Sequence, residues 1–296
     1  MAINRATDLS NASNDLLLAS VITERVATVM RPLVTVKTIP QGRNQITANT
    51  FGTVSISALT DGVDLAAPSS FTPTQFTLTA SERGAMVVIT DKARRETVGN
   101  VESDAGQELG NALAEDFDTQ LFGQFDSFST NALGSSSTEI TLVYALSGYS
   151  LLYGNSTQPV PATGKISYVG HTFTIAKLQS LLSIPGTSNI PPSLQGAALE
   201  AGIGRGKYQV GVLFDMGVYH SPKLTVASNA AKGAIFHEQA LYVAEEARPR
   251  IEEERNASLR ATEYVIVRDD GVGIRENEWG CEMHFDAATP SGTTTL

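Results

Sequence analysis

The residue types that most often do acid–base or metal chemistry are few and scattered in this chain of 296 residues. Four histidines are present, and no two of them stand at the i,i+4 spacing of a helical metal site: His171, His220, His237 and His284. The single cysteine, Cys281, belongs to no catalytic motif, and a lone cysteine is more often a buried apolar residue than a nucleophile. We therefore predict structural histidines and no metal or cofactor.

Residues 202–206 read Gly-Ile-Gly-Arg-Gly, which resembles part of a nucleotide-binding loop. That fingerprint needs a strand before it, a helix after it and an acidic residue about 20 positions later. Here the patterns on either side predict a helix before and a strand after. We interpret the segment as a flexible loop.

A dense run of charges, Glu-Glu-Glu-Arg at residues 252–255, could hold catalytic carboxylates. Acid–base catalysis requires a concave site that drives two pKa values apart, and nothing in the sequence indicates one. We therefore predict that the protein is not an enzyme. Two other interpretations stay open: a solvated strand face, or ion pairing between subunits with Arg248, Arg250 and Arg260, which we prefer.

Composition narrows the class of protein. Hydrophobic residues make up 42% of the chain, which excludes wholesale disorder, whereas charged residues make up only 18%. A surface with few charges suits burial against other proteins. The net charge of −10 argues against a protein that reads nucleic-acid sequence. Because no apolar run is long enough to span a membrane and no signal peptide or disulfide is indicated, we expect synthesis and use in a cytoplasm.

The first 32 residues are predicted to form an arm. After a polar start, apolar residues at helical spacing, including Leu17 and Val21, predict an amphipathic helix that ends before Pro32. This helix could pack on its own core or on a neighbouring subunit. At the other end, residues 287–296 are a polar tail.

A long hairpin is predicted for residues 40–81. Alternating apolar and polar residues indicate strands near 54–58 and 76–80, and an Asp-Gly pair marks a turn between them. Only two aspartates carry charge between residues 51 and 81. Since an isolated two-stranded hairpin is marginally stable in water, we expect this one to lie on another surface.

The clearest helical signal covers residues 101–125. Seven apolar residues recur at every fourth position: Val101, Ala105, Leu109, Leu113, Phe117, Leu121 and Phe125. At 3.6 residues per turn such a stripe drifts about 40° per step. The helix must therefore cross its neighbours obliquely and rest on several elements in turn.

The rest of the chain predicts a mixture of helices and strands. Residues 140–153 are ambiguous between helix and strand, and a second helix begins at Thr174. Further strands, one more helix and one irregularity are expected as follows: strands at 33–39, 86–89, 166–169, 208–214 (buried), 240–244 and 263–268, a helix at 192–200, and a bend or bulge at 269–271. The fold class is α+β.

The order of these features resembles the major capsid protein of tailed bacteriophages, with the Hong Kong 97-like fold. The most specific stretch runs from 233–237 through Ala-Thr-Glu-Tyr-Val-Ile-Val-Arg at 261–268 to Gly-Val-Gly-Ile at 271–274. The resemblance implies the following parts: an N-terminal arm (1–32), a peripheral domain (33–133 and 237–286) that contains the extended hairpin or E-loop (40–81) and the spine helix (101–125), an axial domain (134–236) and the polar tail.

What the resemblance implies is self-assembly. Such subunits form pentamers and hexamers that build an icosahedral shell around double-stranded DNA in the virion, after assembly in the bacterial cytoplasm. A portal, and possibly separate scaffolding and cement proteins, would be partners, with no membrane. An encapsulin-like nanocompartment is the alternative on the same fold; an enzyme with an unrecognised site and a β-rich tail or adhesin component are the other classes.

The resemblance also implies where subunits touch. We expect contacts in the arm, the hairpin and the charged strand: Leu17, Val21, Arg43, Phe51, Val54, Ile56, Asp61, Phe71, Phe76, Arg83, Arg248, Arg250, Glu252, Glu254 and Arg260. Some relatives crosslink covalently through a lysine on this hairpin, but no lysine stands between residues 38 and 91. We therefore expect no such crosslink. Because the arm is short, we also expect no large propeptide and a scaffold that, if present, is a separate protein.

Overall fold

The computed structural model describes residues 28–51, 56, 58, 59, 61, 73–96, 101–155, 158–183, 208–246 and 249–289. Several predicted features lie outside these ranges: most of the arm with its helix, the helix at 192–200, the loop at 202–206, and the residues Leu17, Val21, Val54, Phe71 and Arg248. The side chain of Phe51 is also outside the description. Within the described part of the chain, no helix is both long enough and apolar enough to cross a bilayer.

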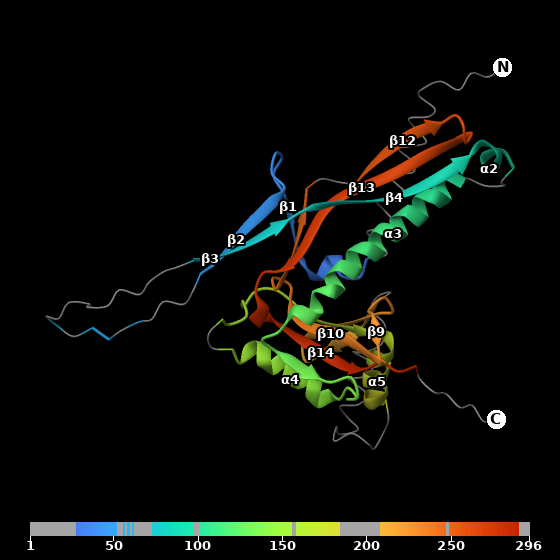
Figure 1. Ribbon diagram of the computed structural model, residues 1–296. Coiled ribbons are helices and arrows are strands. Elements are labelled where there is room, and N and C mark those ends of the chain that lie inside the picture. Colours follow the sequence, from blue (N-terminus) through green and yellow to red (C-terminus); the bar gives the residue numbers. More distant parts are fainter. Residues whose placement is uncertain are drawn as a thin grey trace, which may run out of the picture.

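Two sheets, joined by one long helix, make up the mixed helix and strand fold (Figure 1). The first sheet has five strands: β1 (Thr35–Thr38), β4 (Ser81–Thr90), β11 (Leu241–Glu245), β12 (Arg250–Asn256) and β13 (Ala261–Ile274). The long strand β13 is its axis, because β4, β11 and β12 all pair with it. The predicted bulge at 269–271 is wrong: Asp270 pairs in register with both Ser81 and Glu245, and these partners on both edges hold the strand regular.

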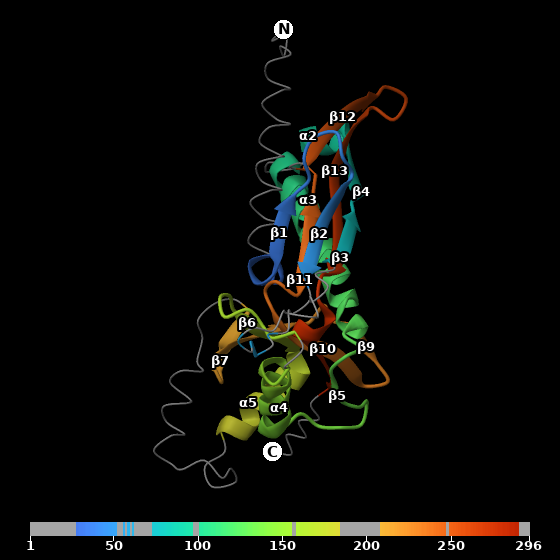
Figure 2. The same ribbon diagram turned by 90° about the vertical axis from the view of Figure 1, so that its left-hand side faces the viewer.

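The long helix α3 (Val101–Gly123) confirms the helix predicted for 101–125. It follows the short helix α2 (Asp91–Glu96) and leads into the 3-10 turn η2 (Phe125–Ser127). In its first half Leu109 and Leu113 pack against Tyr264 and Ile266 of β13. In its second half the helix joins a different core cluster through Phe117 and Leu121, and Phe125 of η2 belongs to the same cluster. The stripe therefore rests first on the first sheet and then on a cluster to which both sheets contribute. The helix runs along the first sheet and reaches the second (Figures 1 and 2).

The second sheet forms the lower lobe in Figure 1, and its order is β5-β14-β10-β6-β8-β7 with β9 beside β10. The bounds of its strands are as follows: β5 (Ala132–Gly134), β6 (Ile166–His171), β7 (Gln209–Leu213), β8 (Met216–Ser221), β9 (Val226–Ala227), β10 (Ala230–His237) and β14 (Gly280–Asp286). Tyr168 and Ile235 face a core that lies between the sheet and the helices α4 (Leu142–Tyr153) and α5 (Thr172–Ser183). Val169 and Phe236 face the opposite way, toward the end of α3. The sheet is thus buried on both faces.

Two predictions in this lobe are settled. The ambiguous segment 140–153 is the helix α4, and the Thr141 side chain accepts a hydrogen bond from the Tyr144 amide at its N-terminus. The strand predicted as buried at 208–214 is instead the edge strand β7, with Val212 44% exposed. It is exposed because β8 is its one partner in the sheet.

The domain boundaries stay predictions; β14, which we assigned to the peripheral domain, pairs with β10 in the lower sheet.

The hairpin is a separate two-stranded sheet of β2 (Gln45–Phe51) and β3 (Pro73–Thr79). It projects away from both larger sheets (Figure 1). The strand predicted near 54–58 is wrong, since Ile56 and Ala58 are not in a strand. Pairing of Gln45 with Thr79 sets the register, so the strand lies earlier in the chain, where the apolar pattern is weaker.

Replacement of Leu121 by alanine tests the crossing of the helix. Leu121 is fully buried where α3 meets the second core cluster, so Leu121→Ala should lower the free energy of unfolding by about 2–5 kcal/mol. Chemical denaturation of the unassembled subunit measures this. The exposed neighbour Thr119 is the control, and Thr119→Ala should change stability by less than about 0.5 kcal/mol. Equal losses in the two variants would contradict the packing described.

Candidate assembly surfaces

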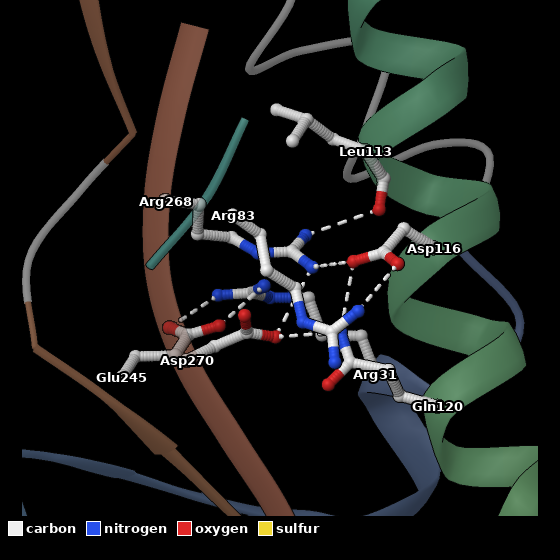
Figure 3. Close-up of polar contacts among 8 residues, drawn as sticks. All are labelled: Arg31, Arg83, Leu113, Asp116, Gln120, Glu245, Arg268 and Asp270. Atoms are coloured by element: carbon white, nitrogen blue, oxygen red, sulfur yellow. Dashed lines mark hydrogen bonds and ion pairs between the residues drawn. The ribbon is translucent and has the colours of Figure 1, made fainter. Parts of the chain in front are cut away.

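A buried arginine holds the middle of α3 against the first sheet (Figure 3). Arg268 on β13 is 2% exposed, and its guanidinium lies 3.1 Å from the carboxylate of Asp270, which is fully buried. The same guanidinium donates to the Leu113 carbonyl oxygen at 3.0 Å and pairs with Asp116 at 3.2 Å, both on α3. One side chain therefore joins the axis strand to the helix.

Further polar groups complete this cluster. Gln120 donates to Asp116 at 2.8 Å and to Asp270 at 3.3 Å, and Arg83 on β4 pairs with Asp116 at 3.1 Å. Burial raises the pKa of Asp270, while the charge of Arg268 opposes that shift. Arg83, which we expected at a contact between subunits, thus pairs within its own chain.

A second buried carboxylate fixes the last residues of the predicted arm. Asp118 on α3 is 4% exposed. It accepts hydrogen bonds from the amides of Val29 at 2.9 Å and Met30 at 3.0 Å. Burial is the largest influence on this group and raises its pKa to about 6, against the two amides, which lower it. The chain after residue 27 is therefore anchored to the helix through backbone groups.

The outer face of the first sheet carries an apolar stripe. Ala85, Val87 and Ile89 of β4 face α3, so the alternating residues Met86 and Val88 point the other way and are 59% and 42% exposed. Met86 pairs with Val265 across the ladder to β13. This outer face, formed by Met86, Val88 and the partly exposed Val265, is an apolar surface that the described part of the chain does not cover.

Charged residues flank the outer face, and several of them are paired within the chain. Arg250 on β12 lies 2.8 Å from Glu82, 3.3 Å from Glu252 and 3.4 Å from Asp269. The sequence left open a choice between solvation and pairing with a neighbour. The structure adds a third arrangement, ion pairs across adjacent strands of one subunit.

The far end of the first sheet is also closed by ion pairs. Arg255 makes two contacts with Asp91, at 2.8 and 2.6 Å, and its hydrogen bond lowers the pKa of that carboxyl. Arg260 has a left-handed backbone (φ 50°) in the turn between β12 and β13, and its carbonyl oxygen accepts from the Asp91 amide. These contacts tie the turn to α2.

The hairpin residues are the most exposed apolar groups among the described residues. Ile56 is 98% exposed and Leu59 is 78% exposed, and Arg43 and Asp61 are also exposed. Phe76, in contrast, is half-buried at the root of the hairpin, edge-on to Tyr242. The predicted contact residues therefore divide between the projecting hairpin and the charged strands, and the structure does not bring them together in one subunit.

Sequence reasoning missed the buried carboxylates and Arg268. Their one signal is the placement of charges between apolar residues of a core pattern, as in Phe117-Asp118 and Val267-Arg268. It also missed exposed Val143, Leu146 and Tyr153 on α4. Among the residues that the structure describes, no group of three or more acidic, histidine or cysteine side chains could hold a metal ion.

The raised pKa of Asp118 gives a pH-dependent stability. A folded-state pKa near 6, above the ordinary 3.8, means that the folded protein holds this proton more tightly than the unfolded chain. The group's stabilising contribution is therefore full below about pH 4 and is lost as the pH rises through 6. From pH 7 to 4, the unfolding free energy of the wild type should rise by about 2–3 kcal/mol relative to that of Asp118→Asn.

Denaturation of both proteins across this pH range measures that difference. Other titrating groups, including Asp270, are common to the two proteins and cancel. A difference between wild type and variant that stays flat from pH 4 to 7 would contradict the assignment.

Comparison with known proteins places this geometry in a family. The family model described as phage capsid protein matches residues 73–282. No curated protein matches the chain. Among solved structures, the chain is similar to one from Mycobacterium phage Che8, with 17% identity, a TM-score of 0.65 and coverage of 86% of this chain and 90% of that one.

Two further capsid structures are similar. For Ralstonia phage GP4 the identity is 12%, the TM-score 0.66 and the coverage 87% of this chain and 88% of that one. For cyanophage Pam1 the values are 10%, 0.68, 89% and 93%. At these identities the likeness establishes the fold, and the family model covers most of the chain. The chain therefore belongs to the phage capsid protein family, and it is a bacteriophage capsid shell protein with the Hong Kong 97-like fold.

Proposed function

We propose that this chain is the major shell subunit that assembles as pentamers and hexamers into an icosahedral capsid enclosing double-stranded DNA. The observation that carries the proposal is the projecting hairpin β2–β3. Its exposed apolar residues include Ile56 and Leu59. A two-stranded ribbon of this kind is marginally stable alone, so a surface on another copy supplies the burial that its own chain does not.

The outer face of the first sheet is the surface that suits this hairpin. Met86 and Val88 present apolar area there, and the hairpin segment from 51 to 81 carries only two charges. The flanking Arg250 already has partners in Glu82 and Asp269. Burial of Arg250 therefore leaves this charge with its partners, which lowers the cost of its desolvation. The predicted contacts at Arg43, Asp61, Glu252, Glu254 and Arg260 would lie at the edges of this interface.

The charge of the subunit suits a container for DNA. Phosphate affinity comes chiefly from lysine and arginine, and the chain has a net charge of −10. A lining without a strongly basic face lets DNA move during packaging and makes no sequence-specific contacts. Assembly would take place in the bacterial cytoplasm. A portal would admit the DNA, and scaffolding or cement proteins would be separate partners.

Two acidic substitutions on the outer face test the interface. The double variant Met86→Glu, Val88→Glu places two carboxylates in the apolar stripe and should abolish assembly, because both charges would be buried unpaired. Folding of the isolated subunit should change little. The control Gln107→Glu, Asn111→Glu adds the same charge at exposed positions of α3 and should still assemble. Particles are measured by sedimentation and negative-stain microscopy; normal shells from the first variant would contradict the proposed contact.

The contents of the particle test the function itself. Particles purified from a phage lysate and treated with nuclease should release protected double-stranded DNA when they are disrupted. Empty recombinant shells, treated in the same way, are the control. Particles that hold a cargo protein and no protected DNA would overturn this function and favour an encapsulin-like compartment.

A further inference from the structure

Two glycines of β13, Gly271 and Gly273, lie directly beneath the root of the hairpin. They belong to the Gly-Val-Gly stretch at 271–273. In the ladder to β11, Gly271 pairs with Ala244 and Gly273 pairs with Tyr242. Both are buried, and both stand where the chain passes from the hairpin into β4.

Gly271 lets the chain cross over the axis strand. A Cβ atom at this position would overlap the carbonyl oxygen of Thr79 and would lie 3.0 Å from its carbonyl carbon and 3.3 Å from the Cα of Ala80. These separations are inside the roughly 3.5–4.0 Å of carbon–carbon contact, and the atoms belong to the backbone. One residue later, Ser81 is already paired with Asp270 in the first sheet. No side chain fits between the crossing strands.

Gly273 supports the two apolar side chains at the hairpin root. A Cβ atom there would lie 3.1 Å from Leu78 and 3.2 Å from the ring of Phe76. Phe76 also meets the ring of Tyr242 edge-on, with centroids 6.5 Å apart. Leu78 joins a small core of Ile39 and Ala244. The inner side of the hairpin thus rests on a strand surface that has no side chains of its own.

We propose that Gly271 and Gly273 form a seat that sets the angle at which the hairpin leaves the subunit, and thereby the angle at which neighbouring copies join. In the described ranges β2 and β3 pair only with each other. One further backbone bond closes the root, from the Ala80 amide to the Asn44 carbonyl oxygen at 2.9 Å. Among the described strands, none from another sheet hydrogen-bonds to the hairpin, so its direction depends on the packing at its root.

The length of the hairpin amplifies a change at the seat. Each strand has seven residues, which is about 23 Å at 3.3 Å per residue. A tilt of about 10° at the root moves the far end of the paired strands by about 4 Å. The inference about joining angle rests on the proposed assembly through the hairpin, whereas the seat itself is a property of one subunit.

Spin-label distances in the unassembled subunit test the seat. Labels go on Thr74→Cys, near the far end of the paired strands, and Glu108→Cys on α3, both at exposed positions; the one native cysteine, Cys281, is fully buried. Gly271→Ala should shift the mean distance by about 3 Å or more, because backbone must move. Gly123→Ala is the control, since no atom lies within 4 Å of a Cβ there. Unchanged distances in Gly271→Ala would overturn the seat.

A gentler variant covers the case in which Gly271→Ala does not fold. Gly273→Ala meets the flexible ends of Leu78 and Phe76, so the fold survives while the hairpin shifts by a smaller amount. Adding Phe76→Leu removes one of the two obstructing side chains and should bring the distance back toward the wild-type value. A Gly273→Ala distance equal to wild type, or a shift that Phe76→Leu does not reduce, would contradict the seat.

Assembly then tests the consequence. Gly271→Ala, or Gly273→Ala where the first does not fold, should form particles of altered diameter, open sheets or tubes, while Gly123→Ala forms normal shells. Normal shells from a variant whose hairpin has moved would overturn the link between the seat and the joining angle. If wild-type subunits form no particles at all, the proposed function fails, and the distances still decide whether the seat exists.

Discussion

The contact between Arg268 and α3 is the interaction on which the two-sheet arrangement depends. A guanidinium that is 2% exposed needs partners for its charge and its donors. It finds them in Asp270 on its own strand and in Asp116 and Leu113 on the helix. A hydrophobic stripe alone would let a helix slide along a sheet, whereas these directional contacts fix one position. Since α3 reaches both sheets, fixing it on the first also places the second.

Elements with local signals could be predicted from the sequence. The helix at 101–125 was predicted correctly because seven apolar residues repeat at one spacing, and the strand predicted at 263–268 is the middle part of β13. Strand β2 was misplaced because its boundaries depend on pairing with β3, whose nearest residue is 22 positions away. The exposure of β7 was missed because its position at the edge of the sheet depends on which strands pair with it, and the residues of β7 alone do not determine that.

The polar anchors were missed for the same reason, and this matters for reading capsid function. Asp118 binds amides 88 and 89 positions away, and Arg268 reaches a carbonyl 155 positions away. The predicted contact residues that the structure describes, in contrast, are mostly exposed or half-buried groups, and their contacts with other copies stay a prediction. Within one subunit, part of the charge on β12 is already paired, as in the contact between Arg250 and Glu82. The exposed apolar stripe beside these pairs is the feature that suits a subunit of an assembly better than a protein that works as a monomer.

The order of strands has a consequence for synthesis. β13, the axis of the first sheet, and β14, an interior strand of the second, occupy residues 261–274 and 280–286. While these residues are still inside the ribosome, neither sheet of the nascent chain is complete. Helix α3 then has no complete sheet against which to pack. Folding of both sheets is thereby postponed until residues 261–286 have left the ribosome, and the surfaces that the two sheets present to other molecules take shape only then.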